Sequence, residues 1–340
     1  MTANDGAVQL DRLIARFQAV ASPLRQQLVE LHGELARLTG GAVADYIPEL
    51  ARARPEWFGL SVVTLDGQVC EVGDTQQAFT IQSISKPLVY GMALDHLGLD
   101  EVLRRVGVEP TGDPFNAVMV DERSCRPHNP MVNAGAIAAS DLIPGAGPTE
   151  RLHALLETFR RYTGRAVTID GAVFTSERET GHRNRAIAHL MRNFGMLSPR
   201  LEESLDLYFQ QCAILVTSRD LATIAATLAN GGVNPVTGEQ AIATAHVRHV
   251  LSVMYSCGMY DSAGEWAFEV GLPAKSGVAG GIMAVVPGQG GIGVFSPPLD
   301  RSGNSVRGVA ACRALTRRYD LHLLSGTSRS TGLRDAARRG

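Results

Sequence analysis

The chain has 340 residues, of which 45% are hydrophobic and 19% are charged, a composition typical of a soluble globular protein with one large domain or two smaller ones. Its formal net charge of -2 shows no basic excess, which argues against a nucleic-acid partner. No run approaches the roughly 18 apolar residues of a membrane span, so we expect no membrane partner. The N-terminus lacks the features of a signal peptide, and five scattered cysteines without CxxC spacing indicate free thiols in a cytoplasmic protein.

The first elements are helical. An apolar stripe over residues 10–17 predicts that an N-terminal extension, residues 1–25, is partly helical. Leucines at every third or fourth position predict a second helix, which begins at Pro23 and ends at Gly40–Gly41. Residues 59–65 and 68–73 then flank Asp66–Gly67 and predict a β-hairpin, because Asp-Gly suits the twist of a tight hairpin turn.

A long helical stretch follows, from residue 83 to about residue 255. It includes a nearly all-apolar helix over 88–98 and a helix over 218–232 that begins at the capping residue Ser218 and ends at paired glycines. Three short strands are predicted over 273–280, 281–288 and 291–298, then an amphipathic helix over 304–324 and a polar tail over 325–340. This order predicts an α/β (α+β) fold. Residues 26–82 and 265–324 would form one antiparallel sheet flanked by helices, beside a mostly helical lobe, residues 83–264, with a ligand cleft between them.

The lysines are unusually few. Only Lys86 and Lys275 occur among the 32 basic residues, and the rest are Arg. An ammonium, unlike a guanidinium, can lose its proton near neutral pH when it is buried. Lys86 follows Ser83 by three positions, so both side chains share one face of a helix. Pro87 is tolerated only in a first helical turn, so the helix begins near Ser83 and leaves the Ser83 N–H without an intrahelical partner.

The second lysine stands in Lys275-Ser276-Gly277, on a predicted strand. The pattern S-x-x-K followed by a downstream K-[ST]-G strand is typical of serine β-lactamases and penicillin-binding proteins. A charged Lys275 near Lys86 would lower the pKa of Lys86 by repulsion, and a neutral Lys86 could then accept the proton of Ser83.

Longer blocks carry a more specific resemblance. PHNPMVNAGAI (127–137), SERETGHRN (176–184), LDLYFQQCAI (205–214), TLANGGVNPVTGE (227–239), SCGMYDSAG (256–264) and GLPAKSGVAGG (271–281) resemble the serine-dependent glutaminase family, bacterial and kidney-type. The resemblance runs from about Asp45 to about Cys312. It implies a β-lactamase-like fold over residues 26–324 and hydrolysis of L-glutamine to L-glutamate and ammonia. It also implies no metal, no organic cofactor, and a homodimer or homotetramer.

The resemblance also implies site residues. Ser83 would be the nucleophile, Lys86 its base and Tyr260 a proton relay, while the N–H groups of Ser83 and Val278 would bind the oxyanion and Lys275 would support them. The glutamine pocket would be lined, together with Ser83, Tyr260 and Val278, by Tyr46, Gln82, Asn133, Glu177, Asn184 and Tyr208. Glu177 is the only acid in this set and the natural partner for the α-ammonium of the substrate. Glu122 and Glu179 are nearby alternatives.

Other patterns admit other interpretations. Gly288, Gly290 and Gly293 match G-x-G-x-x-G, but a strand follows instead of the helix that a dinucleotide site requires. His246 and His249 lack a third metal ligand, and Cys257 has no suggested His partner. Two alternative functions remain: a β-lactam-recognising hydrolase of the same fold, for which S-x-N and Y-x-N motifs are missing between the lysine motifs, and an inactive glutamine-binding module.

Overall fold

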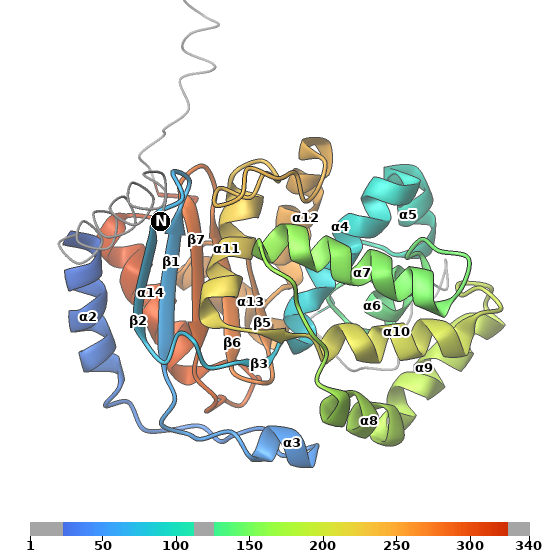
Figure 1. Cartoon of the computed structure of the whole chain (residues 1–340), viewed down its shortest axis with the longest axis horizontal. Helices are drawn as coiled ribbons and strands as arrows, with labels where there is room; N and C mark the ends of the chain where they lie inside the picture. The colour runs from blue at the N-terminus through green and yellow to red at the C-terminus, as the bar shows by residue number, and fades with distance from the viewer. Residues whose placement is uncertain (1–22, 112–125, 326–340) are drawn as a thin grey trace, which may run out of the picture.

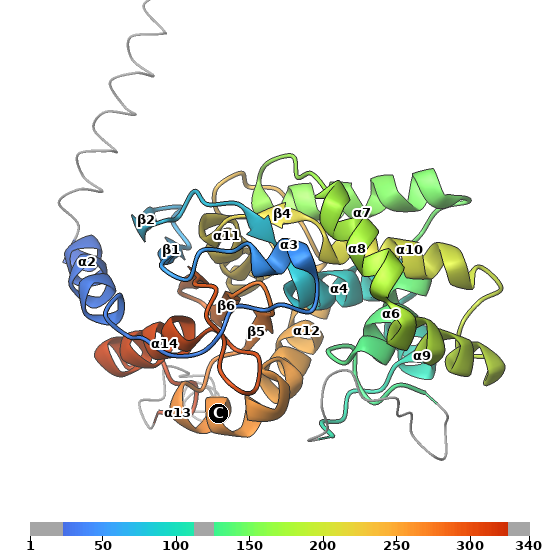
Figure 2. The same cartoon turned by 90° about the horizontal axis from the view of Figure 1, so that it is seen from below.

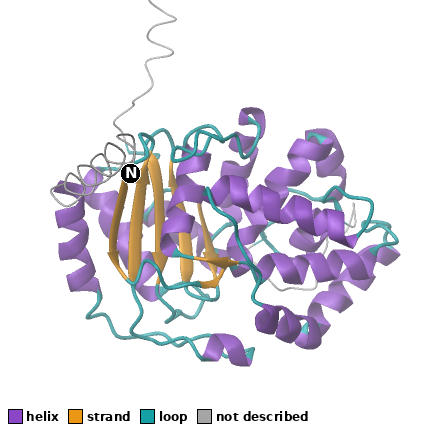
Figure 3. Ribbon diagram, in the orientation of Figure 1, coloured by secondary structure: helices purple, strands orange, loops and turns teal. Residues whose placement is uncertain are grey.

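A five-stranded antiparallel sheet forms one side of the protein in the computed structural model, which describes residues 23–111 and 126–325 (Figure 1, Figure 3). The spatial order is β2-β1-β7-β6-β5. The strands are β1 (Gly59–Thr64), β2 (Val69–Gly73), β5 (Ala274–Gly277), β6 (Gly281–Val286) and β7 (Gly290–Phe295). Since β1 pairs along its length with β7, the sheet joins two parts of the chain that are far apart in sequence.

The predicted hairpin is confirmed. β1 and β2 pair from Gly59 opposite Gly73 to Val63 opposite Val69. Gly67 in the connecting turn has a φ of 79°, a left-handed conformation that glycine adopts without steric cost. The three strands predicted over 273–298 are also present, as β5, β6 and β7.

Helices cover both faces of the sheet. α2 (Pro23–Leu35) packs on β2, and α14 (Val306–Tyr319) packs on β6, β7 and α2. α11 (Ser218–Ala229) covers the opposite face over β1, β6 and β7. Every residue of β6 and β7 is therefore buried. α11 lies within residues 83–264, the range predicted for the helical lobe, yet it packs on the sheet.

Glycines in β7 explain the close approach of α11. A Cβ atom at Gly293 would lie 2.0 Å from the Ser218 carbonyl oxygen, and one at Gly291 would lie 2.3 Å from the Ala222 oxygen. Both distances are far below van der Waals contact, so only glycine fits at these two positions. The capping residue of α11 is Thr217 and not the predicted Ser218, because the Thr217 and Asp220 side chains form a reciprocal capping box.

Most of the remaining helices form a second layer beside the sheet, whereas the last of them, α13 (Ala263–Glu269), lies near α14 and shares its core cluster (Figure 2). The others are α3 (Pro48–Ala51), α4 (Lys86–Leu97), α5 (Leu99–Arg105), α6 (Asn133–Asp141), α7 (Pro148–Thr163), α8 (Gly171–Thr180), α9 (His182–Asn193), α10 (Leu201–Cys212) and α12 (Thr244–Cys257), with the 3-10 helices η1 (Gln82–Ser85) and η2 (Tyr260–Ser262). β3 (Phe79–Thr80) and β4 (Leu215–Val216) pair separately. Among the described residues, no helix combines the length and apolarity needed to cross a membrane. Residues 1–22 of the predicted extension and 326–340 of the tail lie outside the described residues.

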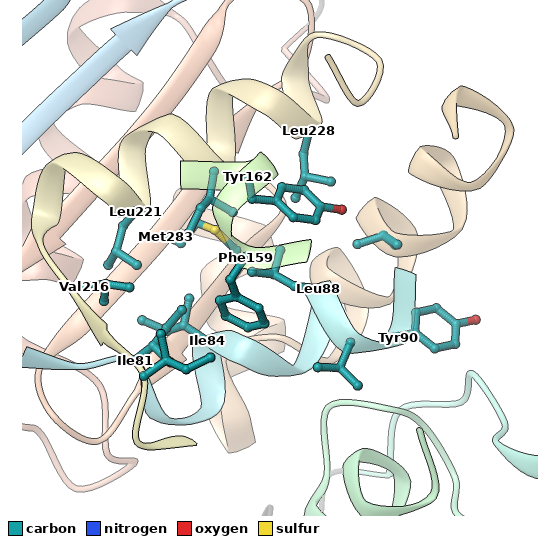
Figure 4. Close-up of a cluster of buried hydrophobic side chains, with 14 of the residues drawn as sticks. Ile81, Ile84, Leu88, Tyr90, Phe159, Tyr162, Val216, Leu221, Leu228 and Met283 are labelled. Carbon is teal, nitrogen blue, oxygen red and sulfur yellow. The ribbon is translucent and has the colours of Figure 1, made fainter. Parts of the chain in front are cut away.

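The apolar core anchors the segment that leads into α4. Ile81, Ile84 and Leu88 are fully buried, and their side chains lie among those of Phe159 and Val216 (Figure 4). The core thus fixes one side of the turn that carries Ser83.

Candidate active site

Ser83 lies in a short turn, residues 81–86, which we call the serine turn. Its N-terminal end is fixed by the Ile81 N–H, which donates to the Ile214 carbonyl at 2.8 Å, and its C-terminal end continues into α4. Ser83 is the second residue of η1, so its N–H has no acceptor within that helix. Its side chain reaches a cavity and is 7% exposed. As predicted from Pro87, the helical segment begins near Ser83.

Lys86 is buried directly behind this turn. Its Nζ donates to the Asn133 Oδ1 at 2.7 Å and to the Met131 carbonyl at 3.0 Å. Both acceptors are uncharged, and burial lowers the pKa of Lys86 to about 8. A substantial fraction of Lys86 is therefore neutral near pH 8, as a base requires.

Tyr260 approaches the serine turn from η2. Its hydroxyl hydrogen-bonds to the Ser83 side chain and donates to the Ser276 carbonyl at 3.0 Å. Since its one proton goes to Ser276, the phenol oxygen accepts from Ser83. Burial raises the pKa of Tyr260, so the phenol stays protonated at neutral pH. Its φ of 53° is left-handed, an uncommon conformation for a non-glycine residue.

Lys275 lies behind Tyr260 and is also buried. Its Nζ donates to the Ser276 carbonyl at 2.8 Å and to the Gly258 carbonyl at 2.9 Å, and it lies 4.1 Å from the centroid of the Tyr260 ring. Burial, and then repulsion from Lys86, hold the pKa of Lys275 well below its usual range. Burial is the main cause of the lowered pKa of both lysines, and the repulsion between two ammonium groups is mutual. That Lys275 keeps its charge and lowers the pKa of Lys86 stays a prediction.

A cavity of about 370 Å³ opens in front of Ser83. It lies where the helical layer meets the turn between β5 and β6, which is where the sequence pattern predicts a cleft. Its walls gather eight of the predicted residues from positions far apart in the chain: Tyr46, Gln82, Ser83, Asn133, Glu177, Asn184, Tyr208 and Val278. Lys86, Tyr260 and Lys275 are not on its wall.

Among the described residues, Glu177 is the only acidic side chain on the wall of this cavity. Its carboxylate accepts from the Tyr46 hydroxyl at 2.8 Å and also hydrogen-bonds to Gln82. Burial raises its pKa from the ordinary value. Of the two alternative acids, Glu179 is exposed and does not line the cavity. Glu122 lies outside the described residues.

Two amide side chains on the cavity wall, those of Asn133 and Asn184, are held in place by each other. The Asn133 Nδ2 donates to the Asn184 Oδ1 at 3.0 Å, while the Asn133 Oδ1 is occupied by Lys86. The same asparagine thus connects the buried amine to the cavity wall. Tyr46 also lines the cavity. Half of its surface is exposed, although its hydroxyl hydrogen-bonds to Gln82 and Glu177.

Within the part of the chain that the structure describes, four further residues line the cavity without having been predicted. They are Thr180, Gly181, Arg183 and Cys212. Each except Cys212 lies within the block 176–184, and Cys212 lies within the block 205–214, so the family resemblance covered them without assigning them a role. Burial raises the pKa of Cys212 to about 12, which keeps it a thiol at neutral pH.

The other singled-out motifs lie elsewhere. Gly290 and Gly293 belong to β7, where they permit close packing against β1 and α11, and Gly288 lies in the preceding turn with a φ of 70°. The glycine pattern therefore has a packing explanation. The rings of His246 and His249 are 6.0 Å apart, and within residues 23–111 and 126–325 no cluster of three metal-ligating side chains occurs.

Comparison with solved structures extends these findings. A structure described as Mglu in its glutamate form superposes with a TM-score of 0.86 at 45% sequence identity, and the alignment covers 90% of this chain and 70% of that one. A probable glutaminase, ybaS, gives a TM-score of 0.86 at 39% identity over 90% of this chain and 99% of that one. The predicted fold class, a β-lactamase-like antiparallel sheet with flanking helices and a mostly helical part, is confirmed.

Sequence comparison gives the family. The family model described as Glutaminase matches residues 41–324. The glutaminase of Trichormus variabilis is 64% identical over 89% of this chain and 90% of its own length, and that of Microcystis aeruginosa is 60% identical over 91% of each. The chain belongs to the glutaminase family, and the prediction of a glutaminase is confirmed.

Proposed function

We propose that this protein hydrolyses L-glutamine to L-glutamate and ammonia through a γ-glutamyl ester on Ser83. The observation that carries the proposal is the position of Ser83: on the wall of the cavity, hydrogen-bonded to Tyr260, and three residues before the buried Lys86. The 45% identical Mglu has a structure described as its glutamate form, which supports a site that accepts the product.

The first step forms the ester. Neutral Lys86 accepts the Ser83 proton, and the oxygen attacks the side-chain amide carbon. The N–H groups of Ser83 and Val278 then stabilise the oxyanion, each worth about 3 kcal/mol of barrier. Tyr260 gives its proton to the nitrogen and receives the proton that Lys86 took from Ser83, the C–N bond breaks, and ammonia leaves. Water hydrolyses the ester, which releases glutamate and restores the Ser83 hydroxyl.

The cavity supplies the groups that recognise the rest of the substrate. Glu177 pairs with the α-ammonium, because it is the one carboxylate that residues 23–111 and 126–325 place on the wall. Asn184 and Tyr208 carry neutral donors that can hold the α-carboxylate without a counter-charge. The Tyr46 hydroxyl donates to the Glu177 carboxylate and keeps this carboxylate in one orientation. Together, one carboxylate and several neutral donors suit an amino-acid substrate with a polar side chain.

Lys275 acts in this scheme by holding Tyr260. Its Nζ bridges the Gly258 carbonyl, two residues before Tyr260, and the Ser276 carbonyl, which the Tyr260 hydroxyl itself contacts. This bridge connects the Tyr260 turn to β5. Its contribution is therefore the orientation of the phenol.

The remaining proposals concern the whole protein. Residues 26–324 form the catalytic domain, the active protein is a cytoplasmic homodimer or homotetramer, and neither metal nor organic cofactor takes part in the reaction. Light scattering measures the number of subunits in solution. Activity that is unchanged after treatment with a metal chelator would support a reaction without a metal.

The deciding experiment couples detection of ammonia and glutamate. Purified protein is given L-glutamine, with L-asparagine as the control substrate and a penicillin as a test of the alternative β-lactam activity. The proposal requires equal amounts of ammonia and glutamate from glutamine, with little from asparagine. Binding of glutamine without release of ammonia would identify an inactive binding module instead.

A further inference from the structure

The backbone at Gln82 is held in an unfavourable conformation. Its φ is 51°, and among the described residues it is one of only three non-glycine positions with a positive φ. Such a conformation costs about 1–3 kcal/mol and persists only where the surroundings impose it. Gln82 immediately precedes Ser83, so its backbone decides where the Ser83 side chain points.

A buried hydroxyl holds the carbonyl of this residue. The Ser85 Oγ donates to the Gln82 carbonyl at 2.7 Å. Ser85 is completely buried and points away from the cavity, which its side chain does not line. The Ser85 hydroxyl has a single proton. A second group that donates a hydrogen bond to the Ser85 oxygen would favour giving that proton to the Gln82 carbonyl.

Gln211 is that donor. Its Nε2 lies 3.2 Å from the Ser85 Oγ, and its Oε1 lies 2.9 Å from the Ser140 Oγ. All three side chains are fully buried. Ser85 also hydrogen-bonds to the Cys212 thiol. With Nε2 as a donor to the Ser85 oxygen, the Gln82 carbonyl at 2.7 Å is a stronger acceptor for the Ser85 proton than the neutral thiol. In this orientation of the amide, Oε1 faces Ser140 Oγ, which also lies 2.9 Å from the Ala136 carbonyl.

The three side chains also connect the elements that carry the site. Gln211 belongs to α10, which supplies Tyr208 to the cavity, and Ser140 belongs to α6, which begins at Asn133. Ser85 belongs to the serine turn. The Gln211 amide thus connects α6 and α10, which carry cavity residues, to the serine turn.

We propose that Gln211 is a positioning residue for the Ser83 nucleophile, acting through Ser85 and the carbonyl of Gln82. It does not touch the cavity, and it deepens the proposed function on which it rests. Loss of the Gln211 donor frees Ser85 to rotate, releases Gln82 from its left-handed conformation and displaces the Ser83 oxygen. The rate of the chemical step falls, while the side chains that bind substrate from α8 and α9 remain in place.

The test is a double-mutant cycle in the full-length protein. Gln211→Met keeps the length of the side chain and removes the donor, and Ser85→Ala removes the hydroxyl. Each is expected to lower kcat for L-glutamine at least tenfold with KM changed less than threefold. If both act through one chain, the double variant is no slower than the slower single variant. Gln210→Met, at the adjacent half-buried position, is the matched control and should keep wild-type kcat.

The outcomes separate the possibilities. Losses in kcat that multiply in the double variant would show that Gln211 does not act through Ser85, and a folded Gln211→Met protein with kcat within twofold of wild type would show that Gln211 only fills space; either result overturns the proposal. If Gln211→Met does not fold, Ser85→Ala decides alone, and an unchanged kcat overturns the proposal. An inactive wild type would refute the proposed function. A crystal structure of Ser85→Ala then still tests the inference, which requires Gln82 to leave its positive φ.

Discussion

The pairing of Glu177 with the substrate ammonium is open to a direct test by Glu177→Gln. The change removes the charge and keeps the shape. The Tyr46 hydroxyl, now 2.8 Å from the carboxylate, can donate equally to an amide oxygen, so the cavity wall should be preserved. Because Glu177 is only 9% exposed, water compensates poorly for the loss of its charge. The effect on glutamine binding therefore reports the charge.

The expected magnitude follows from that burial. A hydrogen bond to a charged group contributes about 1.5–3 kcal/mol. At about 1.4 kcal/mol per factor of ten, this corresponds to a rise in KM of roughly 10- to 150-fold. The catalytic groups around Ser83 are unchanged, so kcat should fall much less than kcat/KM.

The assay compares two substrates on two proteins. Values of kcat/KM are measured for L-glutamine and for N-acetyl-L-glutamine, which has no ammonium. Wild type should strongly prefer glutamine, and Glu177→Gln should reduce this preference. Glu179→Gln, an exposed carboxylate on the same helix, is the matched control and should behave as wild type. A KM within twofold of wild type for Glu177→Gln, or equal hydrolysis of both substrates by wild type, would refute the assignment of Glu177.

Other predictions address the catalytic groups and the packing. Ser83→Ala should unfold at the wild-type temperature and lose turnover by about 1,000-fold or more, since no ester can form; substantial ammonia release would exclude Ser83 as nucleophile. Lys86→Arg should be as inactive as Lys86→Ala, because a guanidinium stays protonated, and a well-functioning Arg variant would mean that only charge is needed. Since burial lowers the pKa of Lys86 to about 8, the base is neutral above that pH. Wild-type kcat/KM should therefore rise as pH increases through about 8, and a flat profile there would contradict this role. Gly293→Ala should lower the free energy of unfolding by about 1–3 kcal/mol in thermal or urea unfolding, because its Cβ would meet the Ser218 carbonyl; unchanged stability would show that α11 can move aside.

Local patterns were sufficient for much of the fold. The Asp66–Gly67 hairpin and the three strands after residue 273 depend on turn residues and on side chains a few positions apart. The start of helix near Ser83 follows from Pro87 alone. Errors remained at boundaries: α11 is capped by Thr217, since both Ser218 and Thr217 are acceptable caps, and only the capping box with Asp220 distinguishes them.

The spacing of residues also indicated the chemistry. Ser83 and Lys86 are three positions apart, and the only other lysine stands in a K-S-G motif. Residues of the cavity wall were named through the family resemblance, and the structure brings eight of them together. Spacing alone could not have found Tyr46 and Glu177, which are 131 positions apart and hydrogen-bonded.

Tertiary structure decided the properties that depend on surroundings. The pKa of Lys86 is lowered because the folded chain removes water from its amine and surrounds it with neutral acceptors 45 and 47 positions away. The glycine pattern after residue 287 became a packing feature only when α11 was placed against β7. Gln211 carries no recognisable motif, and its importance rests on burial beside Ser85, 126 positions earlier. Short-range patterns determine which elements form. Burial and charge depend on distant groups brought together by folding, and these set the protonation and orientation of the side chains around Ser83.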